Sequence, residues 1–99
     1  MSKQFEISET INQMDFLRFK SAMMKNNVLI EEQFGSSNWA ELPTDVVYHY
    51  FAKSALESGW ATGEITADEL DSLPVPNDVG AWGKAVFDKY IEIMQPDPK

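Results

Sequence analysis

The sequence contains no cysteine and only one histidine, His49. Disulfides and thiolate metal sites are therefore excluded, and a single imidazole is too little for an ordinary zinc site. The five glycines never fall into the spacing of a dinucleotide-binding or P-loop motif, so no phosphate-binding loop is indicated. We therefore expect no cofactor and no metal ion.

The sequence also lacks any apolar run near the roughly 20 residues that a membrane-spanning helix needs. The first six residues do not contain the apolar core of a secretion signal. We expect a soluble protein of the cytoplasm, or of the host cytoplasm if the protein is viral. With 99 residues, of which 43% are apolar and 24% charged, the chain should fold as a single domain over 1–99.

Basic residues are scarce, and the formal net charge is −8. Between Asn26 and Gly83 the only base is Lys53, against ten acids. Phosphate contacts need clustered lysine and arginine, so this distribution argues against direct binding of nucleic acid. The acidic middle of the chain suits either attraction of a basic partner or a solvated face that keeps a small protein soluble, and both interpretations stay open.

Hydrophobic periodicity predicts three main helices, over about 11–25, 43–58 and 78–94, with short extra helical turns between them. This pattern is typical of a mainly α, small helical bundle. Thr10 and Gln13 have the spacing of a capping box for the first helix, and Asn26-Asn27 should end it. Residues 28–34 suit a short helix or a short strand. Phe5-Glu6-Ile7 suits an extended segment or a strand, although nothing in the sequence marks its partner.

The segment 42–59 is apolar around most of its circumference, which is typical of a helix covered by other elements on more than one side. Its N-cap is expected at Leu42 or Thr44, with Pro43 near the first helical position. Its polar residues His49, Lys53 and Glu57 are spaced four apart and form one narrow strip, which we expect to be the part that meets water.

The remaining segments have clear start and stop signals. Residues 60–65 should be irregular, with Trp60 folded onto the core, and Thr66 and Glu69 have the spacing of a capping box for a short helical turn. Asn77 should cap the last helix. Gly80 and Gly83 fall on or near its apolar face, so we expect close approach of another helix or an aromatic ring there. Prolines in the segment 95–99 predict a mobile tail.

No combination of residues indicates catalysis. His49 has no Ser or Cys at a neighbouring helical position, so we interpret it as a surface histidine. The acids of 68–71 do not follow the alternation of a calcium loop. A stripe of Phe and Met on the first helix suits core packing, its commoner use, or the binding of a partner helix. The candidate partner-binding residues are Phe16, Phe19, Met23, Trp82, Glu64, Asp68, Glu69 and Asp71.

Two parts of the chain carry a family resemblance. The first is Phe5-Glu6-Ile7 followed by Asp15-Phe16-Leu17-Arg18-Phe19; the second is Leu73-Pro74-Val75-Pro76, the segment 79–90 and the ending Pro96-Asp97-Pro98-Lys99. Together they resemble bacteriophage tail assembly chaperones. The resemblance implies a helical, acidic protein that shields an aggregation-prone segment of the tape measure protein and helps to recruit tail tube subunits. It implies no catalytic residues.

Two hypotheses of function result. The first is a non-enzymatic protein-binding module, a phage tail assembly chaperone, whose partner is basic or carries an exposed apolar helix. The alternative is an acidic inhibitor that mimics nucleic acid, such as a phage anti-defence protein, and occupies a basic groove of a host enzyme. Neither involves a membrane. The sequence does not fix the oligomeric state.

Overall fold

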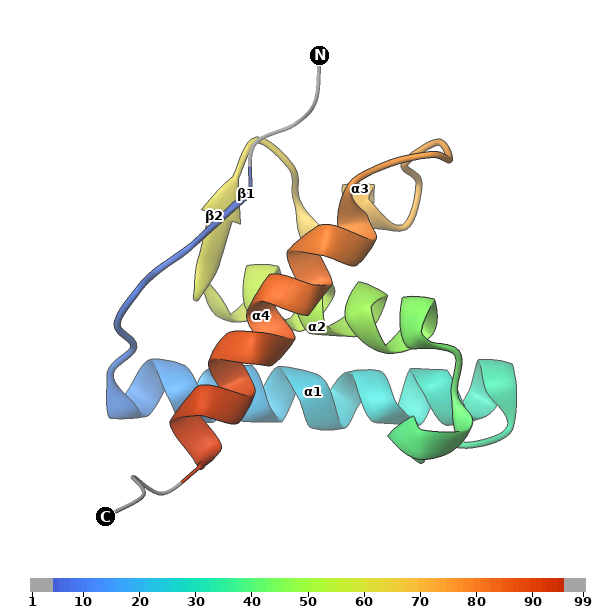
Figure 1. Ribbon diagram of the computed structural model, residues 1–99, viewed down its shortest axis with the longest axis horizontal. Helices are drawn as coiled ribbons and strands as arrows, with labels where there is room; N and C mark the ends of the chain where they lie inside the picture. The colour runs from blue at the N-terminus through green and yellow to red at the C-terminus, as the bar shows by residue number, and fades with distance from the viewer. Residues whose placement is uncertain (1–4, 96–99) are drawn as a thin grey trace.

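A computed structural model describes residues 5–95 of the chain (Figure 1). It confirms a mainly α-helical fold with three long helices. The central one, α2, packs against both α1 and α4, so the expectation that this segment is the centre of the fold is confirmed. The helices are α1 (Gln13–Phe34), η1 (Trp39–Glu41), α2 (Thr44–Ser58), α3 (Ala67–Leu70) and α4 (Val79–Met94).

Helix α1 is longer than the sequence predicted, because it does not end at Asn26-Asn27. The Asn26 side chain is buried, and its Nδ2 donates hydrogen bonds to Ser54 Oγ at 2.8 Å and to Glu57 Oε1 at 3.0 Å. Because these bonds join the side chain to α2, the residue no longer competes with its own helix backbone. Residues 28–34 are therefore helical, and α1 stops at Gly35, which takes the left-handed conformation.

The predicted caps of the helices are partly confirmed. The capping box of Thr66 and Glu69 is present at α3. At α1, however, the cap is Asn12 and not Thr10, and Asn12 Oδ1 accepts a bond of 2.8 Å from the backbone N–H of Asp15. Helix α4 begins one residue later than expected, although Asn77 Oδ1 still accepts the backbone N–H of Val79 at 3.0 Å.

Aromatic side chains fill the core around α2. Phe51 is 2% exposed, and its ring lies 5.0 Å from that of Trp39 and 5.2 Å from that of Phe87. Trp60 folds onto this core as predicted, and its indole N–H donates to the backbone oxygen of Ser8 at 3.1 Å. Burial of such rings is the main stabilising contribution that α2 makes.

A two-stranded antiparallel sheet joins the N-terminal segment to the segment after α2. Strand β1 (Phe5–Ile7) pairs with β2 (Ala61–Gly63), with Ile7 opposite Ala61. The prediction that 60–65 is irregular is therefore wrong, because β1 supplies a partner that no local pattern reveals. The Phe5 ring also stacks on Trp82 of α4, with ring centroids 5.1 Å apart.

One of the two helical glycines explains how closely α4 approaches α2. A Cβ atom at Gly83 would overlap the backbone carbonyl of Tyr48, so only glycine fits there. Gly80 has nothing within 4 Å of the place a Cβ would take. The predicted close approach is thus confirmed at Gly83 and does not occur at Gly80.

Two further expectations concern the C-terminal tail and membrane-spanning helices. Of the predicted mobile tail 95–99, residues 96–99 lie outside the described residues, and Gln95 has an extended backbone after the end of α4. Within 5–95, no helix combines the length and the apolar character needed to cross a bilayer.

Candidate protein-binding face

The Phe and Met stripe nominated from the sequence faces the core. Phe19 is fully buried, and its ring contacts those of Phe51 and Trp60 at centroid distances of 6.2 and 4.8 Å. Met23 and Phe16 are half-buried beside it. Phe19 is therefore a packing residue and leaves no surface for a partner.

The opposite side of α1 carries a second line of apolar side chains, and this line is exposed. Its members are between 45% and 70% exposed. Together with Ser21, which occupies one position of the line, these apolar residues are spaced alternately three and four residues apart. This spacing places them along one face of the helix. We call them the outer stripe: Met14, Leu17, Met24 and Val28.

Basic residues flank the outer stripe. Arg18 lies on one side of it and bonds Asp15 at 2.8 Å, and Lys25 lies on the same side and bonds Glu57 at 3.3 Å. Lys20 lies on the other side, with its Nζ 5.8 Å from the ring centroid of its neighbour Phe16. The Arg18–Asp15 pair is exposed and contributes little to stability, so Arg18 can exchange its present partner for that of a ligand, and Lys25 is 68% exposed although the side chain of Glu57 is only 20% exposed.

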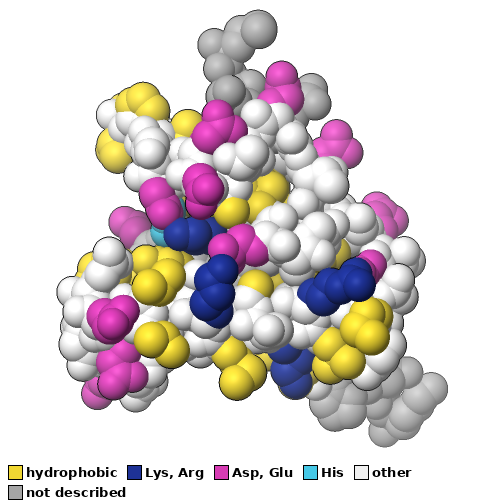
Figure 2. Space-filling model, turned by 180° about the vertical axis from the view of Figure 1, so that it is seen from behind, with side chains coloured by type: hydrophobic (Ala, Val, Ile, Leu, Met, Phe, Trp, Pro, Cys, Tyr) yellow, Lys and Arg dark blue, Asp and Glu magenta, His cyan; other side chains and the backbone are white. Residues whose placement is uncertain are grey.

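The outer stripe and its flanks form one continuous face. Figure 2 shows hydrophobic and basic side chains interspersed over the lower part of the molecule, where α1 faces the viewer. Toward the C-terminal end of α1 the charge changes sign, because Glu31 and Glu32 are exposed there. The face therefore has a basic N-terminal portion and an acidic end.

The outer stripe could be recognised in the sequence only if α1 was known to extend past Lys25. Leu17 and Met24 look like neighbours of the buried line as long as α1 is taken to end at Lys25. When the helix continues past Asn26-Asn27, Val28 extends them into a separate line. A buried line and an exposed line on one helix indicate packing on both sides.

The other nominated residues lie elsewhere. Trp82 is half-buried beneath Phe5, and the acids Glu64, Asp68 and Glu69 are exposed on and beside α3. In Figure 1, α3 lies on the other side of α2 from α1. The structure therefore does not bring the acidic residues and the first-helix residues into one surface.

Asp71 differs from its acidic neighbours because it closes a polar cluster on α2. Its Oδ1 lies 2.7 Å from Nε2 of His49, and its Oδ2 accepts a bond of 2.7 Å from Nζ of Lys53. The Lys53 side chain is only 11% exposed. The expectation that the strip of His49, Lys53 and Glu57 meets water is therefore wrong for Lys53, because the turn after α3 covers it.

The ionisation of this cluster follows from its contacts. Burial acting alone would raise the pKa of Asp71, but hydrogen bonds from Lys53 and His49 outweigh burial and lower that pKa below its ordinary value of 3.8. Burial alone would lower the pKa of Lys53, yet its bond to Asp71 raises it above 10.5. Both groups are thus charged over the whole neutral range.

Two surface hollows meet at this cluster. They have volumes of about 440 and 390 Å³ and share Asp45, His49 and Asp71. Tyr50 supplies the hydroxyl group among their described lining residues, and it donates a bond of 2.9 Å to Gln33 Oε1. The cluster serves as a charged connection between α2 and the turn after α3.

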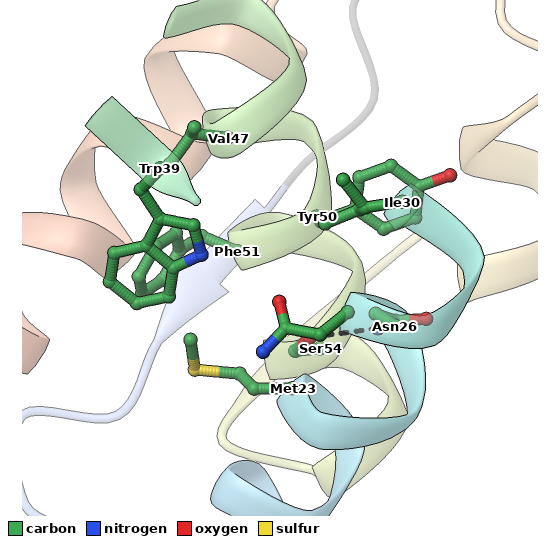
Figure 3. Close-up of a pocket in the computed structure, with 9 residues that line it drawn as sticks. Met23, Asn26, Ile30, Trp39, Val47, Tyr50, Phe51 and Ser54 are labelled. Carbon is green, nitrogen blue, oxygen red and sulfur yellow. Dashed lines mark hydrogen bonds between the residues drawn. The ribbon is translucent and has the colours of Figure 1, made fainter. Parts of the chain in front are cut away.

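A much smaller cavity lies between α1, η1 and α2 (Figure 3). Its volume of about 10 Å³ is close to the space that one water molecule needs. Met23, Ile30 and Trp39 form its apolar lining, and the dashed line in Figure 3 marks the bond between Asn26 and Ser54. A cavity of this size has no room for a substrate.

No group of three or more His, Asp or Glu side chains in the described part of the chain is arranged to hold a metal ion. Comparison of the chain with protein-family models, with curated proteins and with solved structures gives no match. The candidate site is therefore defined by the geometry of α1 alone.

Proposed function

We propose that this protein is a non-enzymatic protein-binding module that receives an amphipathic helix of another protein on the outer stripe of α1. The observation that carries the proposal is the exposure of Met14, Leu17, Met24 and Val28 on the side of α1 that faces away from the core. Exposed apolar patches that are rimmed by polar residues commonly mark interaction sites.

The spacing of the outer stripe favours a helix as the ligand. Alternating steps of three and four residues match the seam along which two helices pack side by side. Full burial of an exposed Leu, Met or Val side chain contributes about 1.5–3 kcal/mol, and the four side chains, which are 45% to 70% exposed, would each supply part of that value. Methionine adapts its shape to different partners, and two of the four residues are methionines.

As the finer role, we propose a phage tail assembly chaperone that shields a helical segment of the tape measure protein. Its support is the sequence resemblance in the segments 5–7, 15–19, 73–76, 79–90 and 96–99. The task also suits the outer stripe, because shielding an aggregation-prone amphipathic helix requires an apolar face that covers the apolar side of that helix.

The proposal can be tested with the full chain and a designed helical peptide of about three heptads. The peptide carries Leu and Ile along one face and uncharged polar residues elsewhere. Nuclear magnetic resonance titration should shift the signals of residues on the exposed side of α1, and Met24→Asp should abolish binding while leaving the fold intact.

Met94→Asp is the matched control, because Met94 is also an exposed methionine, at 48% against 70% for Met24, but lies on α4. It should bind the peptide as the wild-type chain does. Absence of binding, or signal shifts confined to the hollows beside His49, would contradict the use of the outer stripe. Suppression of aggregation of a tape measure segment, lost in Met24→Asp only, would support the chaperone role.

A further inference from the structure

We infer that the outer stripe selects an acidic amphipathic helix of another protein, one that carries Glu or Asp on both sides of its own apolar line. The inference rests on the proposed function and adds the chemistry of the partner. It comes from the positions of the three bases along the stripe and from the charge change at the end of α1.

The three bases occupy the positions that flank a helix-pairing seam. Arg18 directly follows Leu17, and Lys25 directly follows Met24, so both lie on one edge of the stripe. Lys20 lies on the other edge. Residues at these edge positions form the charge pairs between packed helices and thereby choose the partner and its direction. A partner helix with acids at its own edges would pair with all three.

The excess of bases beside the outer stripe is opposite in sign to the net charge of the chain. The chain has eight bases and sixteen acids, yet the first three turns of the outer stripe are flanked by three bases and only one nearby acid of the same helix, Asp15. Asp15 and Glu57 currently pair with Arg18 and Lys25. A bound acidic helix would replace Asp15 as the partner of Arg18 at small cost, and Lys25, itself 68% exposed, would bond it in addition to Glu57.

The same bases disfavour a second copy of this chain as the occupant. In a parallel pair of α1 helices, Lys20 of one copy lies across from Lys25 of the other. In an antiparallel pair that packs Leu17 on Val28, Arg18 lies across from Lys25. Repulsion between like charges at these edges acts against both arrangements, a common means of enforcing specificity.

An anionic membrane surface is also a poor occupant. Glu31 and Glu32 lie at the C-terminal end of the same face, and the net charge of −8 opposes approach to a negative surface. For a partner helix, in contrast, these two acids fix the direction of binding. Its acids must lie opposite residues 18–25, and its end must be neutral or basic opposite Glu31.

The test uses two peptides with the same apolar line, one with Glu and the other with Lys at the edge positions. Fluorescence anisotropy with the full chain should give about tenfold tighter binding of the Glu peptide at low salt. The difference should shrink at about 0.5 M salt, where exposed charges are screened. Arg18→Glu with Lys20→Glu should invert the preference.

Lys84→Glu with Lys89→Glu is the matched control, because it changes the net charge equally on α4 and should leave the preference for the Glu peptide intact. Equal binding of the two peptides would overturn this inference but not the proposed function, whereas binding of neither would overturn both. A dimer in sedimentation that Met24→Asp dissociates, or binding to phosphatidylserine vesicles in preference to the Glu peptide, would also overturn the inference.

Discussion

The ammonium group of Lys53, in the middle of α2, lies 2.7 Å from the carboxylate of Asp71, which belongs to the turn after α3. The lysine side chain is mostly buried, whereas the aspartate side chain is 46% exposed. The pair therefore attaches the segment before α4 to the central helix and neutralises a charge that would otherwise be buried alone.

Replacing Asp71 by Asn should destabilise the protein, because Lys53 would keep its buried charge without a carboxylate partner. We expect a loss of about 1–3 kcal/mol in the free energy of unfolding, measured by urea denaturation. Asp68→Asn is the control and should change stability by less than about 0.5 kcal/mol, since Asp68 is exposed. Equal effects of the two substitutions would show that the bond to Lys53 contributes nothing.

The same pair predicts how stability depends on pH. The pKa of Asp71 is lower in the folded protein than its ordinary value of 3.8, so its contribution is complete above that value and disappears as the pH falls through the folded pKa. The pKa of Lys53 is raised, so the pair is also lost as the pH rises beyond 10.5. Thermal unfolding between pH 2 and 5 should show a smaller pH effect in Asp71→Asn than in the wild-type protein.

Phe51→Ala tests whether α2 is the centre of the core. Four aromatic rings lie within 6.2 Å of the Phe51 ring centroid, those of Phe19, Trp39, Phe87 and Tyr90. Truncation at such a site should cost about 3–5 kcal/mol. Leu17→Ala, on the outer stripe, should cost far less in the same denaturation experiment. If Phe51→Ala lowered the free energy of unfolding by less than about 1 kcal/mol, α2 would not be the centre of the core.

Alanine substitution of the two glycines of α4 should have opposite effects. At Gly83 the new Cβ would overlap the backbone of Tyr48, and moving α4 away from α2 should cost about 1–3 kcal/mol or more. At Gly80 the Cβ meets nothing, so the gain in helix propensity should stabilise the protein by about 0.4–1 kcal/mol. Melting temperatures that shift in the same direction would contradict the close contact between the helices.

Asn26→Asp should destabilise the protein more than Asn27→Asp. Asn26 is buried and donates to Glu57, so a carboxylate there would lose that bond and face a like charge, and Ser54 Oγ would have to donate a hydrogen bond where it now accepts one. We expect a loss of at least about 2 kcal/mol at neutral pH. This loss should become smaller as the pH falls and the new carboxyl group takes up a proton. Asn27 is only half-buried and should tolerate the change better.

The helices could be predicted from the sequence because their apolar spacing and caps are local properties. The length of α1 could not, since Asn26 is a poor helix residue that becomes favourable only through its bonds to Ser54 and Glu57 on another helix. The partner of β1 was equally hidden, because Ala61–Gly63 has no strand pattern and pairs with residues more than fifty positions away.

Of the residues nominated from the sequence, Phe16, Phe19 and Met23 lie on the same helix as the outer stripe but on its core-facing side. The line through Phe16, Phe19 and Met23 contains two aromatic side chains, and the outer stripe contains none. Aromatic side chains bury the most apolar area and therefore face the core. The exposed line became recognisable only when the full length of α1 was known. Burial of Lys53 was also beyond sequence analysis, because it depends on where the turn after α3 returns to α2.

The pairing of β1 with β2, together with the stacking of Phe5 on Trp82, has a consequence for the newly made chain. Residues 5–34 are synthesised before the segments they contact, so β1 has no strand partner until residue 63 follows, and Phe5 has no ring to stack on until Trp82 follows. Until α2 emerges, α1 exposes its core-facing line as well as the outer stripe. The core-facing line is covered only when α2 and Trp60 have been synthesised and Phe51 and Trp60 pack against Phe19.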